Sequence, residues 1–259
     1  MFFDLAAASR FDCVEQLSNL LRDPIFLGDG VPHGRGEPVL LIPGFFAGDW
    51  MMAPMARWLM RVGYRPYLSG IDLNLGCPRE QARRLHWRLS DIFNDVGAPV
   101  SIIGHSLGGV LARTLGRTVP HMTARVVAIG APTRCDWAAM NLRLRPMMES
   151  ATAFWRTMIG APAGCGTARC VCGFFADTQA SVVADVTSIY SRRDEVVDWR
   201  SCVDGRERAF EVGGRHFGLI LNREVYRLIA GILAAEPAPL SRPSIERAAP
   251  RRLLYTVGS

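Results

Sequence analysis

The chain alternates short apolar runs with longer stretches in which apolar residues recur every three or four positions. Continuous apolar runs of about four to eight residues are typical of strands buried on both faces, and the longer periodicity is typical of amphipathic helices. The segments predicted as strands lie at residues 38–45, 65–71, 100–103, 124–132, 185–191 and 208–214, and the apolar runs are clearest at 38–45 and 100–103. Their alternation with helical stretches predicts an α/β fold with a mostly parallel central sheet and helices on both faces.

The helical stretches carry signals at their ends. The stretch 49–64 begins with Asp49, whose carboxylate is expected to cap the helix, and Gly63 is expected to end it. Residues 79–96 and 222–234 each present an apolar stripe on one side. Helices with one apolar side pack on a sheet, which agrees with the predicted layers.

The sequence PVSIIGHSLGGVLAR, residues 99–113, joins a predicted strand directly to a predicted helix. Apolar residues of that helix share one face, and Arg113 is expected on another. Ser106 stands at the junction, between Gly104 and Gly108. A sharp turn exposes a serine hydroxyl, and its tight backbone accepts only small neighbours. The pattern predicts a nucleophilic serine.

A serine hydroxyl is a weak nucleophile that needs a base and a site for the oxyanion. A helix that begins just after Ser106 directs its free N–H groups and positive dipole end towards that charge. The backbone N–H of Leu107 is therefore a predicted oxyanion donor. The alternative is a plain strand–helix turn that uses glycine for packing, but the buried strand before it and the helix after it favour the nucleophile.

Several segments together resemble the α/β-hydrolase superfamily, and more closely its bacterial lipase and esterase branch. GHSLGG is similar to the nucleophile turn of that branch, and IPGFFAGDW to the loop that follows an early strand. SIYSRRDEVVDW and EVGGRHFGLILNREVYRLI resemble its acid and histidine segments. The resemblance spans about residues 38–234. It implies the α/β-hydrolase fold, with the N–H of Phe45 as the second oxyanion donor.

One of the five histidines is favoured as the base. His216 lies in a glycine-rich loop after the last predicted strand, at the carboxyl edge of the sheet, where ligand sites form in such folds. The others lie in the early connector, within a helix, beside the serine or beyond the following helix: His33, His86, His105 and His121. The side chain of His105 is expected to point elsewhere than the serine hydroxyl.

The acid that orients the histidine is expected between Ser106 and His216, just after a late strand. The sequence TSIYSRRDEVVDW offers Asp194, Glu195 and Asp198. Asp194 is the first acid after the strand and matches the Y-S-x-x-D pattern of the branch, so it is preferred over Asp198. Glu195 is expected to face solvent or to pair with a nearby arginine.

Residues from about 134 to 178 interrupt the alternation and are rich in methionine, tryptophan, phenylalanine and cysteine. One interpretation is an ordinary helical layer on the sheet. The other is a helical cap over one end of the sheet that shelters an acyl chain, because methionine and aromatic residues form adaptable apolar walls. The cap interpretation predicts substrate contacts from five side chains: Phe46, Trp137, Met147, Phe154 and Trp155.

The length of 259 residues, 49% of them hydrophobic, suffices for one large core. The prediction is a single α/β-hydrolase domain over residues 1–235, with the cap as an insertion. A mobile tail rich in proline and arginine is expected over residues 236–259.

Charge, hydropathy and cysteine content bear on which partners the protein binds and in which cellular compartment it is expected. The net charge is +6 and all 30 basic residues are arginine, but they are scattered without interleaved aromatics, so no nucleic acid is expected. No run approaches the ~18 apolar residues of a membrane span, and the N-terminus lacks the basic start of a secretory signal. A cytoplasmic location is expected, with the seven cysteines as thiols. The spacing of Cys165, Cys170 and Cys172 fits zinc poorly, so no metal is predicted.

The residues and the resemblance together predict a serine hydrolase that cleaves carboxylic esters with a hydrophobic acyl group, through an acyl-enzyme and without a cofactor. The substrate is a small-molecule or lipid ester, which suggests a role in lipid metabolism. Peripheral contact with a membrane and the oligomeric state are left open. The alternatives are an acyltransferase or thioesterase that uses the same three residues and, less favoured, a non-catalytic binding protein with this fold.

Overall fold

The computed structural model describes residues 2–133, 149–150, 153–154, 157–158, 174, 184–205 and 207–236. Within them, six strands form one all-parallel sheet in the order β2-β1-β3-β4-β5-β6. The strands are β1 (Pro38–Ile42), β2 (Arg65–Leu68), β3 (Val100–His105), β4 (Thr123–Ile129), β5 (Asp185–Tyr190) and β6 (Arg208–Glu211). The predicted parallel α/β architecture is confirmed.

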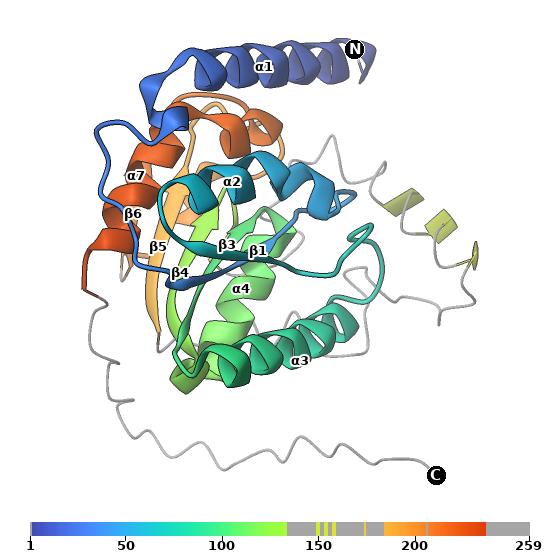
Figure 1. Ribbon diagram of the computed structural model, residues 1–259. Helices are drawn as coiled ribbons and strands as arrows, with labels where there is room; N and C mark the ends of the chain where they lie inside the picture. The colour runs from blue at the N-terminus through green and yellow to red at the C-terminus, as the bar shows by residue number, and fades with distance from the viewer. Residues whose placement is uncertain are drawn as a thin grey trace.

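Helices cover both faces of the sheet (Figure 1). The longer ones are α1 (Phe2–Arg22), α2 (Asp49–Arg61), α3 (Pro78–Val96), α4 (Leu107–Thr118) and α7 (Arg223–Ala234). Short 3-10 helices join them: η1 (Pro24–Leu27), η2 (Pro120–Met122), η4 (Trp199–Cys202) and η5 (His216–Leu221). Two apolar cores result, one under α2 and α7 and the other under α3 and α4.

Alternate residues of the central strands supply the two cores. In β1, Val39 and Leu41 face α2 and α7, whereas Leu40 and Ile42 face α3 and α4, and all four are fully buried. A parallel strand buried on both faces is apolar at most of its positions. This is the physical reason for the unbroken apolar runs in the sequence.

The prediction that Asp49 caps α2 is wrong. The capping position is Gly48, and Asp49 is the first residue of the helix. Its carboxylate instead accepts hydrogen bonds from the N–H and the hydroxyl of Ser69, at 3.2 and 2.6 Å, and from the N–H of Gly70 at 2.7 Å. Asp49 therefore ties the loop after β2 to the start of α2. The predicted end of this helix at Gly63 is confirmed by its left-handed φ of 86°.

Arg113, which was expected on a different face of α4 from the apolar residues, is buried all the same. Arg113 is only 3% exposed. Its guanidinium pairs with Glu207 and donates a hydrogen bond to Ser188 Oγ at 2.6 Å. A buried arginine of this kind requires partners, because an unpaired charge in the interior is costly. The helix that follows the serine is therefore buried on more sides than its sequence pattern suggests.

Most of the predicted cap and the tail beyond residue 236 lie outside the described residues, so the domain boundaries stay predictions. Cys13, Cys77 and Cys202 are free thiols. Burial raises the pKa of Cys202 to about 12, which keeps this thiol protonated. None of the helices that the structure describes is long and apolar enough to cross a membrane.

Candidate active site

Ser106 joins β3 to α4 in a backbone conformation that residues other than glycine rarely adopt, with φ 53° and ψ −123°. Its N–H donates to the carbonyl of Ile129 in β4 at 2.8 Å, and its carbonyl accepts from Gly109 at 2.9 Å. Such strain persists only where surrounding interactions impose it, and it is concentrated at functional sites. A strained serine between strand and helix is the arrangement that exposes a nucleophile.

The glycines on either side of Ser106 are required by close backbone contacts. A Cβ atom on Gly104 would lie 2.2 Å from the carbonyl oxygen of Gly108, and one on Gly108 would lie 2.3 Å from that of Ile42. Backbone atoms at those distances cannot yield without moving a strand. These distances confirm the tight turn that the sequence predicts at the serine.

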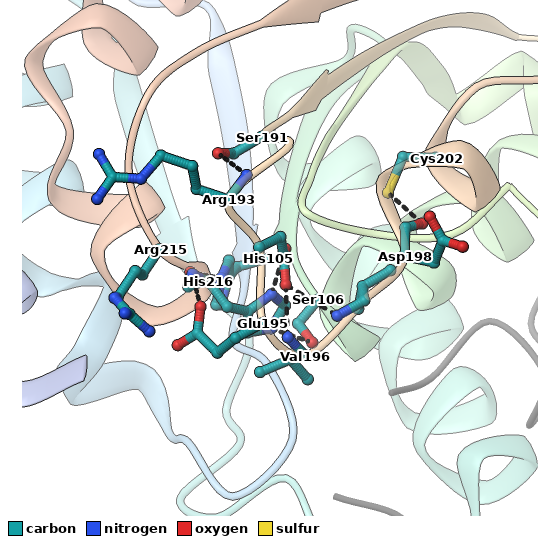
Figure 2. Close-up of polar contacts among 12 residues, drawn as sticks. His105, Ser106, Ser191, Arg193, Glu195, Val196, Asp198, Cys202, Arg215 and His216 are labelled. Atoms are coloured by element: carbon teal, nitrogen blue, oxygen red, sulfur yellow. Dashed lines mark hydrogen bonds and ion pairs between the residues drawn. The ribbon is translucent and has the colours of Figure 1, made fainter. Parts of the chain in front are cut away.

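The structure brings Ser106, Asp194 and His216 together. His216 Nε2 lies 2.9 Å from Ser106 Oγ, and His216 Nδ1 lies 2.7 Å from Asp194 Oδ2. Figure 2 shows Ser106 beside His216, with His105 next to them. The serine follows β3, the aspartate follows β5, and the histidine follows β6 at the start of η5. The three side chains therefore meet at one edge of the sheet.

The Asp194 carboxylate is held on both of its oxygens. Oδ1 accepts the backbone N–H groups of Val196 and Val197, each at 2.8 Å, while Oδ2 bonds the imidazole. The carboxylate therefore cannot rotate away from the ring without breaking backbone hydrogen bonds. Behind the pair, a Cβ atom on Gly130 would lie 3.2 Å from Asp194 Oδ2, so a larger residue there would press on the carboxylate.

The alternative acids and bases lie elsewhere. Asp198 caps η4 by accepting the N–H of Arg200 at 3.0 Å. His33 bonds a loop carbonyl at 3.1 Å. Two further histidines pack against aromatic rings of α3: His86 and His121. The preference for Asp194 and His216 among these candidates agrees with the geometry.

His105 contacts the imidazole of His216, a role that the sequence analysis missed. The two ring centroids lie 4.8 Å apart, and His105 Nε2 is 3.0 Å from the carbonyl oxygen of His216. Because a carbonyl only accepts, Nε2 carries the proton. The buried Nδ1 has no partner within the described part of the chain. Burial, reinforced by His216, lowers the pKa of His105 to about 3, so this ring stays neutral.

Glu195 has a role at the site that the sequence analysis missed. Its Oε2 accepts the backbone N–H of His216 at 3.0 Å (Figure 2). Adjacent acids thus serve one histidine: Asp194 bonds its ring and Glu195 bonds its backbone. Nothing in the local sequence distinguishes this arrangement from a surface carboxylate.

The predicted oxyanion donors adjoin the serine. A Cβ atom on Gly44 would lie 3.1 Å from Ser106 Cβ, so the loop that continues into Phe45 contacts the serine turn. Leu107 opens α4 directly after the serine. The N–H groups of Phe45 and Leu107 have no hydrogen-bond partner among the residues that the structure describes. Unpaired N–H groups are what a site for a developing oxyanion needs.

Asn74 holds the loop after β1 in place. Phe46 in this loop has an unusual φ of 61°, and its N–H donates to the Asn74 carbonyl at 3.1 Å. The backbone N–H of Asn74 donates to the carbonyl of Ala47 at 2.7 Å, and its side-chain amide donates to the carbonyl of Pro43 at 2.8 Å. The strained loop is thereby fixed next to the serine.

Two of the five predicted substrate contacts, Phe46 and Phe154, lie within the described residues. Phe46 is 45% exposed and packs edge-on against Phe45, with 4.9 Å between ring centroids. Phe154 is 71% exposed. Three predicted contacts lie outside the described residues: Trp137, Met147 and Trp155. Within the described ranges, no group of three or more His, Cys, Asp or Glu side chains is arranged to hold a metal ion.

The sequence matches no protein-family model and no curated protein. Solved structures do match. A lipase of Bacillus licheniformis has a TM-score of 0.57 at 14% identity, covering 80% of this chain and 96% of that chain. A soluble variant of the monoglyceride lipase of Saccharomyces cerevisiae has a TM-score of 0.53 at 14% sequence identity, and the match covers 81% of this chain and 91% of that chain. A provisionally assigned non-heme bromoperoxidase of Mycobacterium tuberculosis has a TM-score of 0.56 at 18% sequence identity, and the match covers 80% of this chain and 95% of that chain. At such identities the likeness shows a shared fold.

Proposed function

We propose that this chain, which has the α/β-hydrolase fold, is a serine hydrolase that cleaves carboxylic esters with a hydrophobic acyl group. The fold alone does not select a chemistry, because one fold hosts many. The observation that carries the proposal is the chain of contacts from Ser106 Oγ to His216 Nε2, at 2.9 Å, and from His216 Nδ1 to Asp194, at 2.7 Å.

The first step transfers a proton from the serine to the histidine. As Ser106 Oγ attacks the ester carbonyl carbon, His216 Nε2 accepts the hydroxyl proton. Asp194 accepts a hydrogen bond from the Nδ1–H of His216 throughout, so it keeps Nε2 free for this task and stabilises the imidazolium that forms. The N–H groups of Phe45 and Leu107 hold the negative oxygen of the tetrahedral intermediate.

The second half returns the proton and releases the acid. His216 donates its proton to the departing alcohol oxygen, which leaves the acyl group on Ser106. A water molecule then loses a proton to His216 and attacks the acyl carbonyl. Collapse of this second intermediate frees the carboxylic acid and restores the serine hydroxyl. This chain's residues thus suffice for acyl transfer to water.

An apolar acyl group is supported by the residues beside the predicted oxyanion site. Phe45 and Phe46 follow Gly44, whose backbone adjoins the serine, and their two aromatic rings pack edge-on against each other. Aromatic side chains offer large apolar contact area to a substrate. Two of the solved structures with this fold are named as lipases, which agrees with an apolar substrate.

A series of p-nitrophenyl esters with increasing acyl length tests the proposal. We expect the wild-type kcat/KM to rise with acyl length, and Ser106→Ala to lower it at least ~10⁴-fold. A wild-type protein that cleaves none of the esters would favour a binding role. Hydrolysis that survives in Ser106→Ala would remove this serine from the mechanism. Added alcohols that divert product from acid to ester would indicate acyl transfer as the finishing step.

A further inference from the structure

Helix α1 lies across the molecule on the side of the loop that carries His216 (Figure 1). It precedes the strand–helix alternation, yet it contacts this loop directly: the N–H of Arg215 donates to Asp12 Oδ2 at 3.2 Å. We propose that Asp12 is a positioning residue that holds the backbone of His216 in its working place. The inference rests on the proposed function of His216 and extends the site to a helix that the mechanism does not use.

Asp12 and Glu195 act on consecutive residues of the loop. Asp12 accepts the N–H of Arg215, and Glu195 accepts the next N–H, that of His216, at 3.0 Å. Hydrogen bonds to ionised carboxylates are roughly twice as strong as those between neutral groups. One carboxylate comes from α1 and the other from the loop after β5. The backbone at Arg215 and His216 is therefore hydrogen-bonded to two separate parts of the fold.

Gly218 makes room for the Asp12 carboxylate. A Cβ atom at position 218 would lie 2.0 Å from Asp12 Oδ2 and 3.1 Å from its Cγ. Gly218 has no left-handed backbone, so its lack of a side chain is explained by this close approach and not by chain conformation. The packing of α1 on η5 thus depends on a glycine two residues beyond His216.

Both carboxylates lie at the histidine loop, because they accept the consecutive N–H groups of Arg215 and His216. In agreement with this placement, the pKa of Cys13, the residue after Asp12 on α1, is raised by burial first and then by the negative charges of Asp12 and Glu195. By contrast, Glu15 on the same helix is exposed.

Small shifts of the loop matter because the imidazole has two partners at once. His216 must keep 2.9 Å to the serine and 2.7 Å to Asp194. A displacement of ~1 Å at a reacting group can cost ~10²-fold in rate. Loss of one backbone anchor is expected to loosen the loop by less than that, and to lower kcat more than it raises KM.

The test compares Asp12→Ala with Glu15→Ala, which removes an exposed carboxylate from the same helix. We expect Asp12→Ala to lower kcat about 10-fold, with KM within about two-fold, because one hydrogen bond to a charged group is lost. Asp12→Asn, which keeps an acceptor, should recover most of the rate, and Glu15→Ala should behave as wild type. The folded fraction at the assay temperature, measured by circular dichroism, must stay near one for each variant.

A double-mutant cycle with Gly218→Ala separates positioning from general stability. Gly218→Ala displaces the Asp12 carboxylate, so alone it should lower kcat about as much as Asp12→Ala. In the Asp12→Ala background it should cost much less, because the interaction is already gone. Additive losses, or a kcat of Asp12→Ala equal to wild type, would overturn the proposal.

Nuclear magnetic resonance distinguishes failure of this inference from failure of the proposed function. The proton between His216 Nδ1 and Asp194 is observed in protein labelled with ¹⁵N-histidine and is assigned by its loss in His216→Gln. Positioning by Asp12 predicts a sharp signal in wild type and Glu15→Ala, and a broadened or shifted one in Asp12→Ala. That result would stand even if no ester were cleaved, whereas an unchanged signal would overturn the inference in an active enzyme.

Discussion

The turn that carries Ser106 and the loop that carries His216 are held in place by different kinds of interaction. The serine turn is fixed by close backbone contacts of the first turn of α4 with β3 and β1, where Gly104 and Gly108 leave room for carbonyl oxygens that a Cβ atom would exclude. The histidine loop is fixed by carboxylates from distant segments, Asp12 and Glu195. The nucleophile is thus built into the strands, whereas the base is anchored from outside them.

The difference teaches where each half of the site is vulnerable. A backbone contact cannot relax without moving a strand, so damage to the serine turn should appear as lost stability. A side-chain anchor can be lost while the fold persists, so damage to the histidine loop should appear first as lost activity. Three measurements test this contrast between the serine turn and the histidine loop.

The largest expected effect is on activity, from His216→Gln. We expect kcat/KM to fall roughly 10⁵-fold, because the serine loses its base. Far-ultraviolet circular dichroism should stay as in wild type, since η5 retains its backbone hydrogen bonds. Combining Ser106→Ala with His216→Gln should add little further loss. A variant that keeps a tenth of its activity would mean that the loop does not supply the base.

The next effect is on stability, from Gly108→Ala. Its Cβ atom would lie 2.3 Å from a carbonyl oxygen of β1, so we expect a loss of about 3 kcal/mol in the free energy of unfolding. The control is Gly231→Ala in α7, where no atom lies within 4 Å of the new Cβ. That change should stabilise the protein by about 0.5–1 kcal/mol. Urea denaturation measures both, and equal values would contradict the rigid turn.

The smallest effect concerns His105, which joins the two regions through the His216 carbonyl. Its pKa is lowered to about 3 in the folded protein, against about 6.5 when unfolded. The unfolded chain therefore binds the extra proton as pH falls between these values, and stability falls with it. From about pH 8 to about pH 5 this residue should cost about 2 kcal/mol.

His105→Gln keeps a donor for the carbonyl but cannot titrate. Urea denaturation at both pH values should therefore show a smaller loss in this variant than in wild type. The same loss in both proteins would mean that His105 is not buried in its neutral form. The variant should also retain measurable ester cleavage, because the donor to His216 remains.

The same contrast explains what the sequence predicts and what it does not. The strands, the serine turn and its glycines are readable because their causes are local: burial on two faces requires unbroken apolar runs, and a tight turn requires glycine at fixed spacing. The choice of His216 rests on its place after the last predicted strand, and the choice of Asp194 rests also on the Y-S-x-x-D pattern of the lipase and esterase branch that the sequence resembles.

Long-range side-chain contacts leave no local signal. Asp12 lies 204 positions from His216 in the printed numbering, and no pattern near it indicates a partner. Asp49 stands where a helix-capping residue is expected, but its carboxylate accepts the N–H groups of Ser69 and Gly70 instead. Arg113 lies by spacing on another face than the apolar residues of α4, yet it is buried and pairs with Glu207, which directly precedes β6.

Labelling with a fluorophosphonate probe, followed by peptide mapping, tests the central claim most directly. The probe reacts with a serine only where a base activates it, and it requires no knowledge of the substrate. We expect a single adduct on Ser106, its absence in Ser106→Ala and much slower labelling in His216→Gln. An unlabelled wild-type protein, or an adduct on another residue, would contradict the claim.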